Sequence, residues 1–77
     1  MEIIHDKKID AIYIRFTEMP YAYGRDLDEE RRIDYDINGN VRGVELHCIS
    51  MGVDLHDLPR TNEIAGILKG IGVREYA

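Results

Sequence analysis

The sequence contains a single cysteine, Cys48, so no internal disulfide and no zinc site built from cysteines can form. A lone thiol suits a reducing compartment. Long hydrophobic runs are also missing, since every apolar stretch is far shorter than the roughly 20 residues that a membrane-spanning helix needs. The first eight residues include Glu2, Asp6, Lys7 and Lys8, a pattern that a signal peptide does not have. These absences predict a cytoplasmic protein with no membrane partner.

Positive charge is scarce as well, because 15 acidic residues outnumber 10 lysines and arginines and leave a net charge of −5. A protein that binds the nucleic-acid backbone needs a basic surface, so we expect no nucleic-acid partner. The negative net charge favours a cationic partner. A chain of 77 residues has room for one small domain, residues 1–77, and its 44% apolar content exceeds what a disordered chain carries.

The clearest pattern in the chain is the alternation of apolar and polar residues with a period of two, which is typical of half-buried strands. It predicts strands at residues 1–6, 11–17, 21–26, 31–37 and 41–48. The second, fourth and fifth of these strands each have an expected apolar face. Its residues are Ile12, Ile14, Phe16, Ile33, Tyr35, Ile37, Val44, Leu46 and Cys48. Asn38 and Gly39 both tolerate positive φ and predict a two-residue hairpin turn. In the first strand, Ile3 and His5 point one way and Ile4 the other.

After residue 52 the spacing becomes helical. Ile64, Ile67, Leu68 and Ile71 follow a helical period. Pro59 suits the first turn of a helix, and Asp57 is the expected cap. The predicted fold class is therefore α+β: an antiparallel β-sheet, a meander of about four or five strands over residues 1–51, then a linker and one C-terminal α-helix, residues 52–77, that packs on one face of the sheet.

Three stretches taken together carry a family resemblance: residues 10–16 (DAIYIRF), 33–41 (IDYDINGNV) and 43–46 (GVEL). In this order and spacing they resemble the small bacterial and archaeal proteins of the domain of unknown function 2283 family, over about residues 1–51. The tail looks like a C-terminal helical extension found in some members. The resemblance implies an antiparallel sheet and brings no assigned activity or catalytic residue. Some members are proposed to act as antitoxins toward small toxin-like proteins.

A calcium-loop pattern is present within the fourth and fifth predicted strands. Asp34, Asp36 and Asn38 stand at the first, third and fifth positions, Gly39 at the sixth and Glu45 at the twelfth. An EF-hand needs a helix on each side of this loop, whereas the flanking residues here alternate as strands. A β-hairpin therefore accounts better for the pattern, and the four oxygen-bearing residues stay as candidates for a cation-binding module.

The three histidines offer a second alternative, a small-molecule binder or enzyme that uses His5, His47 or His56. No pair of them has the spacing of a helical metal site. His47 and Cys48 are neighbours on a strand and point to opposite faces, so they would not form a nucleophile–base pair. The chain also has no serine elbow, phosphate loop or nucleotide fingerprint. We therefore expect no catalytic residue, no metal and no cofactor.

Aromatic residues suggest a contact surface instead. Four tyrosines are expected along one side of the sheet, namely Tyr13, Tyr21, Tyr23 and Tyr35. Tyrosine gives a large rigid contact with a hydroxyl group, which is common at protein interfaces. The sequence thus favours a non-catalytic protein–protein interaction or oligomerisation module. A symmetric homodimer is the default form, and a small basic protein, in an antitoxin-like pairing, is the alternative partner.

Overall fold

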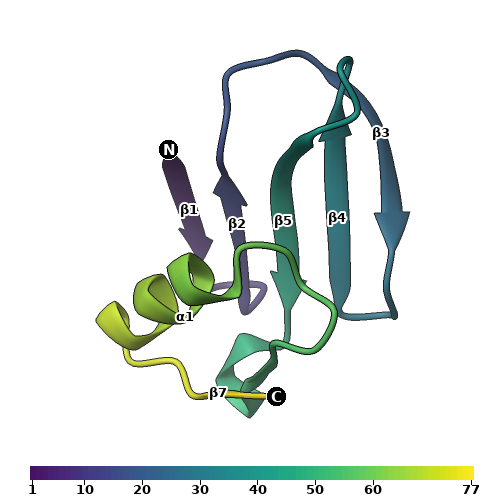
Figure 1. Ribbon diagram of the computed structural model, residues 1–77. Coiled ribbons are helices and arrows are strands. Elements are labelled where there is room, and N and C mark those ends of the chain that lie inside the picture. The colour runs from purple at the N-terminus through teal and green to yellow at the C-terminus, as the bar shows by residue number, and fades with distance from the viewer.

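The computed structural model describes residues 1–77, and its main element is a five-stranded antiparallel sheet. The strands are β1 (Glu2–Asp6), β2 (Ala11–Arg15), β3 (Tyr21–Asp26), β4 (Arg31–Asp36) and β5 (Val41–His47). Strands β3, β4 and β5 follow one another as a meander, and the β1–β2 hairpin joins them through β5, so the spatial order is β1-β2-β5-β4-β3 (Figure 1). The connection from β2 to β3 therefore passes over the end of the sheet.

The rest of the chain lies on one side of this sheet. It contains the 3₁₀ turn η1 (Ile49–Met51), the short strand β6 (Val53–Asp54), the helix α1 (Thr61–Gly70) and the short strand β7 (Glu75–Tyr76). Strands β6 and β7 pair in parallel, and α1 crosses in front of β1 and β2 (Figure 1). The predicted α+β fold with a single C-terminal helix is confirmed. No helix of the structure has the length and apolar character of a membrane span.

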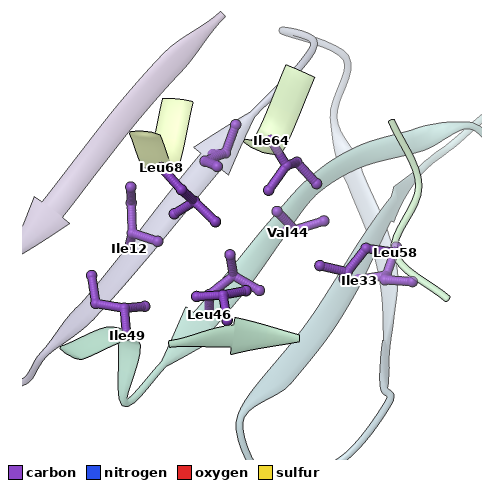
Figure 2. Close-up of a cluster of buried hydrophobic side chains, with 10 residues drawn as sticks. Ile12, Ile33, Val44, Leu46, Ile49, Leu58, Ile64 and Leu68 are labelled. Atoms are coloured by element: carbon purple, nitrogen blue, oxygen red, sulfur yellow. The ribbon is translucent and has the colours of Figure 1, made fainter. Parts of the chain in front are cut away.

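One hydrophobic core fills the space between the sheet and this C-terminal layer. Figure 2 shows the strand residues pointing toward Ile64 and Leu68 of α1. The ten buried members are Ile12, Ile14, Ile33, Val44, Leu46, Ile49, Val53, Leu58, Ile64 and Leu68. Ile12 pairs across the strands with Leu46, and Ile14 pairs with Val44, so the period-two pattern of β2 and β5 meets in register.

The helix begins differently from the sequence prediction. Asp57 is not its cap: the residue before α1 is Arg60, which has a left-handed backbone (φ 53) and makes no side-chain capping bond. Arg60 instead pairs with Glu63 at 2.9 Å and lies 4.3 Å above the ring of Phe16. At the other end, Gly72 adopts φ 78 and stops the helix, as glycine does at a C-terminal cap.

Two residues that the alternation assigned to the core lie outside it. Ile37 is 61% exposed because β4 ends at Asp36, one residue earlier. Cys48 is exposed because β5 ends at His47 and the backbone of Cys48 turns into the left-handed region (φ 56). Ile49, the next residue, takes the buried position instead. A period-two pattern holds only while the chain stays extended.

The turn between β4 and β5 is longer than the predicted two-residue turn. It has three residues, 37–39, between Asp36 and Asn40. The backbone N–H of Asp36 donates to the carbonyl of Asn40 at 2.8 Å. The N–H of Gly39 donates to the carbonyl of Asp36 at 2.9 Å, and only Gly39 has a positive φ (80°). These features fit a three-residue hairpin loop with glycine at its left-handed position.

Candidate interaction surface

The face of the sheet opposite the helix carries no covering layer, and we call it the open face. Its side chains follow from the strand pairing, because paired residues point to the same side. Its members from β1, β2, β4 and β5 are Glu2, Ile4, Asp6, Ala11, Tyr13, Arg15, Arg32, Asp34, Gly43, Glu45 and His47. This surface is mostly polar, and four of its members, Tyr13, Asp34, Glu45 and His47, are residues that the sequence marked as candidates.

Asp34 is the centre of a hydrogen-bond network on the open face. Tyr13 donates its hydroxyl to Asp34 Oδ2 at 3.1 Å, and Arg32 Nε donates to Asp34 Oδ1 at the same distance. Arg42 Nη1 in turn donates to the Tyr13 hydroxyl at 3.1 Å. Burial raises the pKa of Tyr13 and the Asp34 carboxylate raises it further, while Arg42 acts in the opposite direction. Both oxygens of Asp34 are therefore already satisfied by side chains.

Two glycines let large side chains lie flat on this face. A Cβ atom at Gly43 would lie 2.5 Å from the carbonyl oxygen of Ile14 and 2.7 Å from the Tyr13 hydroxyl oxygen. A Cβ atom at Gly24 would overlap the guanidinium of Arg32. A glycine inside a strand often marks such a close approach. Because the side chains of Tyr13 and Arg32 lie flat over these glycines, the polar network stays close to the sheet across β2, β5, β4 and β3.

Asp36 holds the hairpin turn together. It is 2% exposed, and its Oδ1 accepts hydrogen bonds from the backbone N–H groups of Asn38 at 2.8 Å and Asn40 at 3.0 Å. A carboxylate that accepts backbone N–H groups stabilises a turn in the same way as an Asx motif. The third position of the calcium pattern thus has a structural role in this chain.

The structure does not bring the calcium-pattern residues together. Asp34 bonds to Tyr13 and Arg32, Asp36 bonds to the turn backbone, and Asn38 is exposed at the tip of the hairpin. Glu45 lies on β5 with its carboxylate 3.3 Å from His47 Nε2. The flanking segments are strands, and no group of three or more histidine, cysteine, aspartate or glutamate side chains is placed to hold a metal.

We expect Asp36→Ala to lower the free energy of unfolding by about 1–2 kcal/mol, because two turn N–H groups lose their acceptor and must turn to water. Asp36→Asn keeps an acceptor oxygen and should recover most of the loss. Urea unfolding followed by circular dichroism measures both variants. Equal stability of Asp36→Ala and the unmodified protein would show that the turn does not depend on this carboxylate.

The histidines lie apart from one another. His5 is half-buried on the helix side of β1, His47 is on the open face at the end of β5, and His56 is exposed in the loop before α1. Each of the two pockets of the molecule includes His47 and neither of the others. Cys48 is exposed beside Glu30, and a hydrogen bond to that carboxylate raises the pKa of its thiol. Nothing here assembles a nucleophile with a base.

The smaller pocket is polar and is organised by Arg31. It has a volume of about 90 Å³ between β4, β5 and the segment that contains β6. Arg31 Nη1 donates to the carbonyl of Asp54 at 3.0 Å, and Arg31 Nη2 pairs with Asp28 at 2.9 Å. A backbone hydrogen bond from Glu30 lowers the pKa of Asp28. The arginine thus fastens the C-terminal layer to the sheet.

The larger pocket is an apolar groove on the open face, with a volume of about 180 Å³. It lies where β1, the β1–β2 turn, β2 and β5 meet. Its apolar lining comes from Ile4, Ile9, Ala11, Ile12 and Tyr13, and its polar lining from Asp6, Glu45 and His47. Sequence reasoning missed this groove, because its residues come from four separate segments that each look ordinary.

The tyrosines divide between the two faces. Tyr13 and Tyr21 lie on the open face, where Tyr21 accepts a hydrogen bond from Arg32 at 3.0 Å. Tyr23 and Tyr35 lie on the helix side, and their rings stack with centroids 4.9 Å apart. The prediction of four tyrosines along one side was wrong. Strand alternation puts Tyr13 and Tyr35 on opposite faces, and a register shift separates Tyr21 from Tyr23.

A comparison with protein-family models finds a match over the region of the sheet. The model of a protein family of unknown function, DUF2283, matches residues 2–47. The chain belongs to the DUF2283 family. The DUF2283 match begins with β1 and ends with β5, so it spans the whole five-stranded sheet, while α1 lies beyond it. No curated protein and no solved structure matches the chain. The family description assigns no role.

Proposed function

We propose that this DUF2283 protein is a protein–protein interaction module that forms a symmetric homodimer by pairing two β1 strands. The proposal depends on the free edge of β1, which has one strand neighbour and exposes Ile3 by 45% and Ile4 by 54% on its two faces. An edge strand offers unpaired backbone N–H and C=O groups to another chain. Strand pairing would satisfy these groups and cover Ile3.

The opposite edge of the sheet supports the choice of β1. Pro20 precedes β3, a register shift falls between Tyr21 and Tyr23, and the strand ends on the charged residues Arg25 and Asp26. Proline, bulges and charges discourage pairing at a sheet edge. β1 has none of these devices in its interior and stays in regular register with β2 over all five residues.

Charge distinguishes the two registers that centre the strand pair on an isoleucine. Centring the pair on Ile4 would put Glu2 of one copy opposite Asp6 of the other, and directly opposed like charges are destabilising. Centring it on Ile3 puts the two Ile3 side chains together and Glu2 opposite Ile4. Glu2 also keeps its ion pair with Arg15 at 2.9 Å. We therefore propose a ten-stranded dimer sheet centred on Ile3.

Multi-angle light scattering tests the dimer with a matched pair of variants. The unmodified protein is expected to have twice the mass of one chain, and Ile3→Lys to have the mass of a single chain, because lysines on an edge oppose pairing. Ile37→Lys is the control, since Ile37 is also exposed but lies in the turn between β4 and β5. Circular dichroism should be the same for all three proteins.

A monomeric unmodified protein at high micromolar concentration would overturn the proposal. So would an Ile3→Lys variant that stays dimeric, because the interface would then lie elsewhere. Loss of the dimer in Ile37→Lys alone would assign it to the opposite end of the sheet.

A further inference from the structure

The apolar groove beside β1 is formed within one chain and does not depend on the dimer. Ile4 and Ile9 form two of its walls. They are 54% and 61% exposed, and neither packs in the core. An apolar cavity of about 150 Å³ accepts one benzene ring. The groove, at about 180 Å³, therefore has the size for one large apolar side chain rather than for a drug-sized ligand.

The two carboxylates that line the groove, Asp6 and Glu45, form no ion pair with a lysine or arginine side chain. The only ionic contact of Glu45 is with His47, at 3.3 Å, which is ionic only when the imidazole is protonated. Asp6 accepts a hydrogen bond from the backbone N–H of Lys8 and has no ion pair with a basic side chain. The arginines of this face are engaged with other partners: Arg15 with Glu2 and Glu18, Arg32 with Asp26 and Asp34, and Arg42 with Tyr13 and Met19.

We propose that this groove binds a large apolar side chain of a partner protein, flanked in the partner by lysine or arginine residues that pair with Asp6 and Glu45. The apolar walls would take the side chain, and the two carboxylates would select the charge beside it. A second copy of this chain fits less well, because each copy carries a net charge of −5. The partner is therefore a basic protein.

The test uses the full chain and two blocked pentapeptides with a central phenylalanine, one flanked by two lysines on each side and the other by two glutamates on each side. Two-dimensional ¹H–¹⁵N spectra report binding at single residues. The lysine peptide is expected to shift the amide signals of Ala11, Tyr13 and Glu45 in a saturable way, and added salt should weaken the effect. The glutamate peptide should leave these signals unchanged.

The variants separate the groove from nonspecific attraction to an acidic protein. The double variant Asp6→Asn/Glu45→Gln should weaken binding of the lysine peptide by at least about threefold, the effect of losing two exposed ion pairs. The matched control, Glu29→Gln/Asp57→Asn, removes two exposed carboxylates away from the groove and should keep the affinity. Ile9→Ser should weaken binding without changing any charge.

Several results would overturn the inference. One is that the lysine peptide shifts no amide signal at millimolar concentration. Another is that both peptides bind equally well, and a third is that the double variant and its control lose the same affinity for the lysine peptide. Shifts of the same signals on dilution of the protein alone would assign the groove to a second copy instead. Repeating the titration with Ile3→Lys keeps the two proposals separate, because that variant removes the proposed dimer and leaves the groove residues intact.

Discussion

Leu46→Ala is expected to lower the free energy of unfolding by about 2–5 kcal/mol, the range for deleting a buried leucine side chain. Leu46 is fully buried on the central strand β5 and lies under the C-terminal layer (Figure 2). A chain of 77 residues has a total stability of roughly 4–12 kcal/mol. The loss is therefore a large fraction of the total stability, and at the lower end of that range it is enough to unfold the protein.

Urea unfolding monitored by circular dichroism measures this loss, and Leu55→Ala is the matched control. Leu55 is only half-buried at the edge of the core, and its backbone N–H keeps its bond to the Tyr76 carbonyl in the variant. We expect a clearly smaller effect at this position. Similar losses at both positions would mean that the centre of the core does not lie between β5 and the helix.

Gly43→Ala is expected to lower stability by about 3 kcal/mol, at the upper end of the range for overpacking. The added methyl group would lie 2.5 Å from the carbonyl oxygen of Ile14, and a backbone atom in the middle of a sheet cannot move aside easily. It would also lie 2.7 Å from the Tyr13 hydroxyl oxygen, so Tyr13 should lose its bond to Asp34.

The control for this variant is Gly66→Ala on α1. Nothing lies within 4 Å of a Cβ atom at Gly66, and alanine in a helix is favoured over glycine by roughly 0.5–1 kcal/mol. The same substitution should thus destabilise at one glycine and stabilise at the other. Thermal unfolding gives the sign in each case. A Gly43→Ala variant as stable as the unmodified protein would refute the close approach of Tyr13 to β5.

The strands were predictable because their side chains obey a local rule. Ile12, Ile14, Val44 and Leu46 alternate with polar residues, and all four are buried. The rule failed where a local conformation ended the strand, as at Cys48, whose left-handed backbone no alternation pattern reports. Strand order was not predictable either, because the pairing of β2 with β5 joins segments about thirty residues apart and each strand records only its own faces.

The surface features were harder to foresee. Asp34 and Asp36 fit a calcium-loop pattern, although the alternation of the flanking residues already favoured a hairpin. Their partners, Tyr13 and the turn backbone, could not be read from the sequence. The groove has no signature, since Ile4 and Ile9 become neighbours of Glu45 only after three strands assemble. One signal was available: a glycine in the interior of a strand, here Gly43, indicates that another group approaches closely there.

The pairing of β2 with β5 also has a consequence for synthesis of the chain. A ribosome makes the N-terminal hairpin first, yet β2 has only β1 beside it until the residues of β5 have been added. The buried residues Ile12 and Ile14 therefore stay without their partners on β5 while most of the sheet is being translated. A nascent polypeptide that exposes apolar strands is prone to aggregate, and here that interval ends only when the fifth strand emerges.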